Sequence, residues 1–114
     1  MSAYLVVRVT VTDPEQYGEY VKHTPRILAE YGGRFIVRGG AMTTVEGPEE
    51  TGRLVIIEFP DVESAKAMYE SEDYGLAKAI RAGAGDAQFV IVDGYDEADW
   101  NAALDASRTL DFDR

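Results

Sequence analysis

Hydrophobic and polar residues alternate along residues 4–11, a pattern typical of a β-strand with one buried face. A helix signal follows directly, because Asp13 can cap a helix that has Pro14 in its first turn. Apolar residues then recur at steps of three and four until the glycine pair at residues 32–33, which is typical of a helix end. The pattern therefore predicts a strand followed by a helix.

The next part of the chain repeats this order. Residues 34–43 and 53–59 alternate like two strands, and the polar turn residues between them indicate a hairpin. A second helix starts after residue 60 and restarts at Ser71, and residues 89–92 form a fourth strand. This order predicts an α+β fold of the ferredoxin-like βαββαβ type, an antiparallel four-stranded sheet with two helices on one face.

The length of the chain suits one compact domain, which we place at residues 1–95. The composition then changes, because residues 96–114 contain six acidic and two basic side chains. Trp100 and Leu104 lie at helical spacing in this segment. We therefore expect an acidic C-terminal arm with a short helix, which either clasps a partner subunit or lies on its own domain.

The alternation also sorts the strand residues onto two faces of the sheet. One face is wholly apolar and should be covered by the helices; it carries Leu5, Val7, Val9, Val11, Phe35, Val37, Val55, Ile57 and Phe59. The other face is mixed and carries Tyr4, Val6, Arg8, Thr10, Arg34, Ile36, Arg38, Leu54, Ile56 and Glu58. A sheet face left to water is normally more polar, so we expect a homodimer in which two such faces meet around a two-fold axis.

The composition excludes several classes of function. The chain has no cysteine, which rules out disulfides, thiolate metal sites and a cysteine nucleophile. A net charge of −10 disfavours binding to nucleic acid and to anionic lipid. No apolar stretch reaches the roughly 20 residues of a membrane span, so we expect no membrane partner and a cytoplasmic location. With one histidine and scattered acidic residues, we expect neither a metal nor another cofactor.

The sharpest candidate site lies on the mixed face. If the hairpin turns near Pro48, Arg38 stands directly opposite Glu58. A guanidinium group suits carboxylates and enolates, and a neighbouring carboxylate can carry a proton. Gly39 and Gly40 leave bare backbone beside the guanidinium, where a ligand can approach closely. The alternative is that Arg38 and Glu58 form a structural ion pair at the seam of the dimer.

Other residues have two interpretations each. Arg8 shares the mixed face, either as a second anion anchor or as a rim residue paired with an acid of the arm. Tyr74 follows the helix restart and could donate a hydrogen bond at the mouth of a pocket. His23 is the only histidine and is eligible as a base, but its place off the apolar stripe favours an exposed position. Pro25 lacks an amide hydrogen and predicts a kink or a break near His23.

Three stretches, "GGRFIVRGG", "GRLVIIEFPDVESAKAMYESEDY" and "AKAIRAGA", make residues 4–94 resemble a bacterial family known as domain of unknown function 1330. The resemblance implies a dimeric α/β barrel built from ferredoxin-like subunits. That superfamily includes cofactor-free monooxygenases of aromatic polyketides, muconolactone-type isomerases and haem-binding relatives. The family motif falls here on Arg38, Gly39, Gly40, Glu58, Phe59, Pro60, Ser71 and Tyr74.

Two functional hypotheses follow. In the first, the homodimer binds a small, partly apolar anion between sheet and helices, with cofactor-independent oxygenase or isomerase chemistry. Arg38 is then the anchor, Glu58 its orienting partner or a proton carrier, and Tyr74 a hydrogen-bond donor. In the second, the protein is a non-catalytic binding or interaction module, in which Arg38 and Glu58 fix the dimer. A closed apolar pocket with one titratable group near neutrality would favour the first hypothesis.

Overall fold

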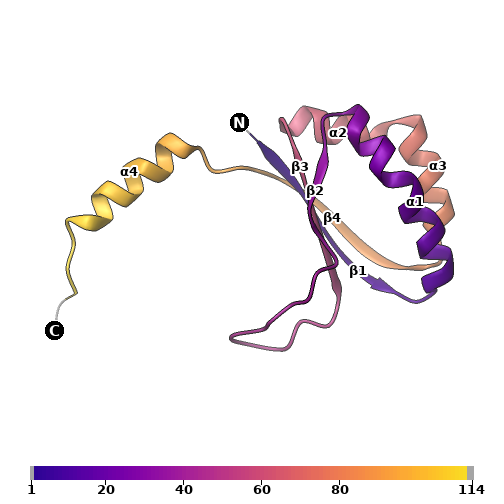
Figure 1. Cartoon of the computed structure of the whole chain (residues 1–114), viewed down its shortest axis with the longest axis horizontal. Helices are drawn as coiled ribbons and strands as arrows, with labels where there is room; N and C mark the ends of the chain where they lie inside the picture. The colour runs from indigo at the N-terminus through magenta and orange to yellow at the C-terminus, as the bar shows by residue number, and fades with distance from the viewer. Residues whose placement is uncertain (1, 113–114) are drawn as a thin grey trace.

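A four-stranded antiparallel sheet in the order β2-β3-β1-β4 forms the centre of the protein, with α1, α2 and α3 on one of its faces (Figure 1). The computed structural model describes residues 2–112. This topology is the predicted α+β, ferredoxin-like fold. The elements in chain order are β1 (Ala3–Val11), α1 (Pro14–Glu30), β2 (Arg34–Arg38), β3 (Arg53–Phe59), α2 (Val62–Glu70), α3 (Glu72–Arg81), β4 (Gly85–Asp93) and α4 (Glu97–Arg108).

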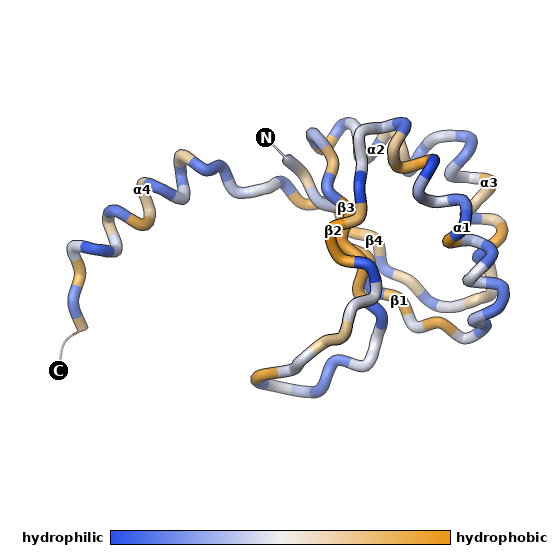
Figure 2. The backbone as a smooth tube through the Cα atoms, viewed as in Figure 1, coloured by the Kyte–Doolittle hydropathy of each residue, from blue (hydrophilic) through white to orange (hydrophobic). Residues whose placement is uncertain are grey.

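The core lies between the sheet and the three helices. Alternate residues of β1 and β3 are buried there, as the sequence pattern predicts: Leu5, Val7, Val9, Val55, Ile57 and Phe59. Figure 2 shows the hydrophobic residues concentrated along these strands. Burial of each such side chain adds about 1.5–3 kcal/mol to the stability of the folded protein. Within the described residues, no helix is long and apolar enough to cross a membrane.

The helix starts follow their predicted caps. The Asp13 side chain accepts a hydrogen bond from the amide of Gln16 at the start of α1. Ser71 caps α3 in the same way, by accepting from the amide of Tyr74. Of the kink or break expected near His23, the break is wrong, because α1 continues as one helix through Pro25.

Strand β2 departs most from the sequence prediction. It ends at Arg38 instead of residue 43, because Gly39 turns the chain with a positive φ of 65°. It also contains a β-bulge between Phe35 and Val37. The one extra residue shifts the following residues to the opposite face of the sheet.

The bulge changes the pairing that the candidate site depends on. Arg34, not Arg38, stands opposite Glu58, and Arg38 stands opposite Val55. Val55 faces the helices, so Arg38 does as well, and the predicted pairing of Arg38 with Glu58 is wrong. Val37 was expected on the helix-facing side, but it stands opposite Ile56 and so lies on the face away from the helices.

We call the face of the sheet away from α1–α3 the outer face. It is mixed, as predicted, and no helix of the domain covers it (Figure 1). Val90 and Val92 on β4 remain 45% and 48% exposed, and Val6, Leu54 and Ile56 are only partly buried. The outer face is therefore a mixed surface with exposed apolar side chains and no cover in the single chain.

Candidate functional site

A cavity of about 30 Å³ lies between α1 and the helix-facing side of the sheet. Its walls are mostly aliphatic and aromatic side chains. The polar residues in its lining are Tyr17, Tyr20, Thr24, Arg38, Arg53 and Tyr74. Among the described residues, no aspartate, glutamate or histidine lines it. The cavity is therefore an apolar site that presents hydrogen-bond donors and positive charge.

Arg38 reaches this site because of a feature of α1. Pro25 has no amide hydrogen, so the carbonyl of Val21, four residues earlier, lacks its usual helical donor. That carbonyl instead accepts from the Thr24 hydroxyl at 3.0 Å and from Nη2 of Arg38 at 3.2 Å. The Arg38 guanidinium carbon also lies 4.2 Å from the centre of the Phe35 ring. The proline thus provides an acceptor that holds the arginine at the pocket.

Replacing Pro25 with alanine is expected to stabilise the protein by about 1–2 kcal/mol, because alanine restores the helical donor and has a higher helix propensity. Thermal unfolding would show this as a melting temperature several degrees higher. Gly75→Ala in α3 calibrates the gain from helix propensity alone, since a side chain there meets no neighbouring atom. A lower melting temperature for the Pro25 variant would mean that the bonds from Arg38 and Thr24 outweigh the cost of the proline.

Arg53, the first residue of β3, brings a second guanidinium group to the cavity. Its guanidinium carbon lies 5.8 Å from the centre of the Tyr17 ring. A Cβ at Gly39 would come within 2.7 Å of that guanidinium carbon, so a larger residue would displace the end of the Arg53 side chain, and the positive φ favours glycine independently. At Gly40 an added Cβ would meet no atom within 4 Å, so close packing does not require that glycine.

Two arginine nitrogens near the cavity have unused bonding capacity. Nε of Arg53 and Nε of Arg81 are buried, and neither has a hydrogen-bond partner among the described residues. A buried donor without an acceptor is costly, and a water molecule, an ion or a ligand can supply the acceptor. Arg53 is the relevant one for the cavity, because its side chain lines it.

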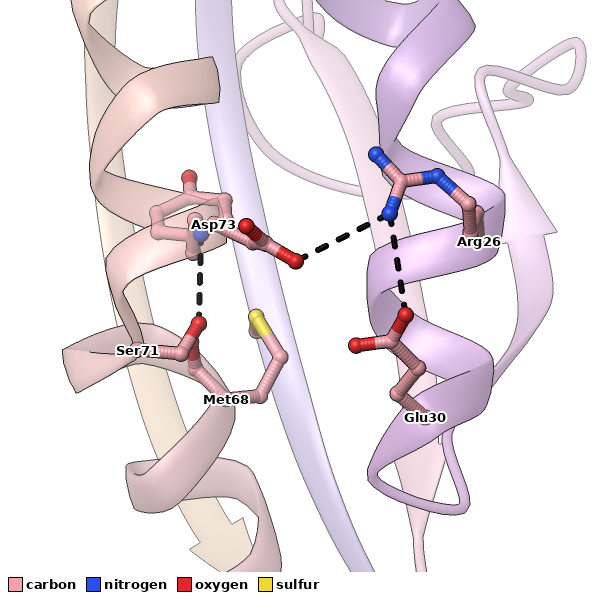
Figure 3. Close-up of polar contacts among 6 residues, drawn as sticks. Arg26, Glu30, Met68, Ser71 and Asp73 are labelled. Carbon is pink, nitrogen blue, oxygen red and sulfur yellow. Dashed lines mark hydrogen bonds and ion pairs between the residues drawn. The ribbon is translucent and has the colours of Figure 1, made fainter.

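Two buried tyrosines, Tyr20 and Tyr74, are among the residues that line the cavity. The hydroxyls of Tyr20 and Tyr74 lie 2.9 Å apart, and their rings meet edge to face. Ser71 lies at the start of α3 (Figure 3), where its Oγ accepts a hydrogen bond from the Tyr74 amide at 3.1 Å and so fixes the first turn of the helix. Arg26 of α1 spans the two helices by lying between Glu30 and Asp73.

The electrostatics of this pair favour hydrogen bonding over proton abstraction. Burial and the adjacent Tyr74 raise the pKa of Tyr20 far above its usual value, so its hydroxyl stays protonated. Burial lowers the pKa of Arg81, but the hydroxyls of Tyr74 and Tyr20 raise it by more, so the net pKa is above the usual value. The Arg81 guanidinium carbon lies 5.5 Å from the Tyr20 ring centre and 4.7 Å from that of Phe89. The Tyr20 hydroxyl is therefore neutral, and it lies near the guanidinium group of Arg81.

The structure separates the predicted site residues into two groups. Arg38 and Tyr74 meet at the cavity, although Tyr74 is only 2% exposed and lies in the core instead of at the mouth. Glu58 lies on the outer face, where its Oε1 is 3.1 Å from Nη2 of Arg34 and its other oxygen 3.5 Å from the Tyr4 hydroxyl.

Arg8 and His23 also lie away from the cavity. Arg8 pairs at 3.4 Å with Glu50 of the β2–β3 loop, so the expected partner from the arm is wrong. His23 is exposed on α1, as its place off the apolar stripe indicates. Among residues 2–112, no three histidine, aspartate or glutamate side chains are grouped in a way that could hold a metal ion.

Sequence reasoning missed Arg53 and Arg81, although both carry a signal. Arg53 has the same parity as Val55 and Ile57, so the alternation of β3 already directs it toward the helices. Arg81 comes seven residues after Tyr74, two helical turns along the same face of α3. An arginine at a position that the sequence pattern directs toward the core is the signal that identifies Arg53 and Arg81.

The sequence matches a family model described as "Domain of unknown function (DUF1330)" over residues 2–95. No curated protein matches the sequence. Among solved structures, a protein of unknown function from Rhodopseudomonas palustris superposes with a TM-score of 0.69 at 18% identity, covering 83% of each chain.

Two further structures are similar in fold. SnoaB, a cofactor-independent oxygenase from Streptomyces nogalater, has a TM-score of 0.58 at 11% identity, covering 83% of this chain and 94% of its own. A dimeric protein of unknown function with a ferredoxin-like fold, from Bacteroides fragilis, has a TM-score of 0.51 at 12% identity, covering 82% and 96%. At these identities the likeness shows the fold alone.

Proposed function

Since the chain belongs to DUF1330, a family described as a domain of unknown function, its function has to be inferred from its own pocket, and we propose that it binds a small, partly apolar anion there. The observation that carries this proposal is that Arg38 and Arg53 both line an apolar cavity, together with two hydrogen-bonded tyrosines. Guanidinium groups beside apolar walls suit an aromatic or aliphatic carboxylate, or an enolate.

The size of the cavity determines where such a ligand would lie. About 30 Å³ holds little more than a water molecule, so the inner cavity can accept only part of a ligand. A groove of about 380 Å³ adjoins it and shares Tyr17, Val21 and Arg53 with its lining. The proposed ligand occupies this groove, with its charged group between Arg53 and Arg38. Because Arg38 is exposed and has one hydrogen bond, it can move to admit the ligand.

The chemistry of the site gives two candidate functions. Tyr74 and Tyr20 could stabilise an enolate by hydrogen bonding, which would support cofactor-independent oxygenase or isomerase chemistry, and SnoaB supplies an example of such an oxygenase in this fold. The alternative, a non-catalytic binding module, is favoured by one observation. Among the described residues, no carboxylate or imidazole that could act as a base lines the cavity.

We also propose that the protein is a homodimer joined through its outer face. The apolar residues left exposed there, including Val90 and Val92, support this assembly. In this arrangement the pair of Arg34 and Glu58 takes the role of structural seam that the sequence suggested for Arg38 and Glu58. The Bacteroides fragilis neighbour is itself dimeric.

A thermal-shift screen of aromatic and aliphatic carboxylates and enolizable ketones tests the pocket. A ligand that binds only the folded protein must raise its melting temperature by mass action. We expect the shift to be lost in Arg38→Ala and Arg53→Ala, and also in Arg38→Lys, since lysine keeps the charge but loses the planar fork. Arg26→Ala is the matched control, because it removes an exposed arginine outside the cavity.

The outcomes distinguish the two candidate functions. Enolizable hits incubated in D₂O should gain deuterium beside the carbonyl if the site stabilises an enolate, and Tyr74→Phe should reduce the rate. Binding without exchange or oxygen uptake would favour the non-catalytic module. Undiminished shifts in both alanine variants would contradict the pocket itself.

A further inference from the structure

Helix α4 leaves the domain in a direction that the fold determines. The Gly94 amide donates to the Ser2 carbonyl at 2.8 Å, which extends the pairing of β4 with the start of the chain. A Cβ at Gly94 would come within 2.6 Å of that same oxygen, so only glycine allows this exit path. From there α4 points away from the sheet on the side of the outer face, opposite α1–α3 (Figure 1).

Within its own chain α4 has almost no support. None of the hydrogen bonds and ion pairs of the described residues joins Glu97–Arg108 to residues 2–94, and no residue of this helix is buried. Trp100 is 53% exposed, and Tyr95, Leu110 and Phe112 are more exposed still. The radius of gyration is 17.5 Å, whereas a compact chain of this length has about 13 Å.

An isolated helix of 12 residues is marginal in water, even when it is well capped. Asp96 caps α4, acidic residues lie in its first turn and Arg108 lies in its last, so its local sequence favours a helix. Trp100, Ala103, Leu104 and Ser107 share one face of it. An amphipathic helix with this face in water is expected to pack on another surface.

We propose that α4 packs along the flank of a second copy of this chain, which is seated on the outer face. This inference rests on the homodimer proposed above and adds to it a contact between α4 of one copy and the flank of the other. A 12-residue helix is about 18 Å long, enough to pass a partner's sheet about 10 Å away and reach its helix layer. Exposed apolar residues continue along the chain from the outer face into the arm: Val90, Val92, Tyr95 and Trp100. The outer face and the apolar side of α4 therefore meet the same partner.

A helix folded back on its own sheet would have to run beside β4, whereas α4 leads away from it (Figure 1). Its two large apolar side chains, Trp100 and Leu104, are also too few to cover a four-stranded sheet. A second copy covers the sheet with its own outer face and leaves α4 free to pack on its side. The two-fold axis then gives each protomer one arm across the other.

The emission of Trp100, the only tryptophan of the chain, tests this contact directly. In the full-length dimer the emission maximum should be blue-shifted, and dilution should move it to that of solvent-exposed tryptophan with the same midpoint as dimer dissociation by light scattering. The monomeric variant Ile56→Asp should show solvent-like emission at every concentration. Trp100→Ala should raise the dimer Kd at least tenfold, whereas Asn101→Ala, on another face of α4, should leave it unchanged.

Three results would overturn the proposal. Solvent-like emission in the intact dimer means a free tail, and blue-shifted emission in the monomeric variant or after dilution means an arm that lies on its own domain. A wild-type protein that is monomeric at micromolar concentration removes both the homodimer and the clasp. The melting-temperature shifts of the pocket variants are measured separately, so they test ligand binding independently of the arm.

Discussion

Replacing Ile56 with aspartate is expected to convert the proposed homodimer to monomers, with a dimer Kd raised about a thousandfold. Ile56 lies in β3 on the outer face, opposite Val6 on β1 and Val37 on β2. Each copy would bury a carboxylate among these apolar side chains, at a cost of at least about 2 kcal/mol per copy. The two-fold axis doubles this to about 4 kcal/mol, and each 1.4 kcal/mol is a factor of ten in Kd.

Light scattering after size exclusion measures this change as a fall from about twice the chain mass of 12.6 kDa to that mass itself. Leu76→Asp is the matched control, because Leu76 is an exposed apolar residue of α3, on the opposite side of the sheet. It should leave the dimer intact. Circular dichroism checks that both variants are folded. An Ile56→Asp protein that is folded and still dimeric would show that the outer face is not the interface.

The second large effect is a loss of stability in alkali that depends on Tyr20. Burial and Tyr74 raise the pKa of Tyr20 in the folded protein, whereas an unfolded tyrosine titrates near pH 10. Above about pH 10 the unfolded chain therefore holds fewer protons at this residue than the folded chain. The contribution of Tyr20 to the free energy of unfolding is present below that pH and falls by about 1.4 kcal/mol per unit above it.

Urea unfolding of the wild type and Tyr20→Phe between pH 8 and about 12 measures this contribution. At pH 8 the variant should be less stable by about 1 kcal/mol, because the Tyr74 hydroxyl loses its partner. Above pH 10 the wild type should lose stability more steeply, by about 2–3 kcal/mol at pH 12. Tyr95→Phe, at an exposed tyrosine, should follow the wild type. Parallel curves for Tyr20→Phe and the wild type would contradict the pKa shift.

Only part of the candidate site can be predicted from the sequence. Arg38 and Tyr74 can be picked out as residues of interest, and both do line the cavity. Their surroundings could not be predicted, because the register of β2 is not encoded in its own alternation. Residues 39–52 form a long connection that does not fix the hairpin register, and a shift of one residue reverses every side chain that follows. Glu58 was therefore assigned to Arg38 when Arg34 is its neighbour.

The order of the elements, the starts of α1 and α3 and the buried residues of β1 and β3 follow from the sequence alone. These features depend on local rules, since a capping side chain bonds an amide three residues away and a strand alternates with a period of two. The turn of Arg38 toward the helices by the bulge in β2, and the continuation of α1 through Pro25, appear only in the folded protein. The two features meet in one contact between distant segments, because Arg38 donates to the Val21 carbonyl that Pro25 leaves without a helical donor.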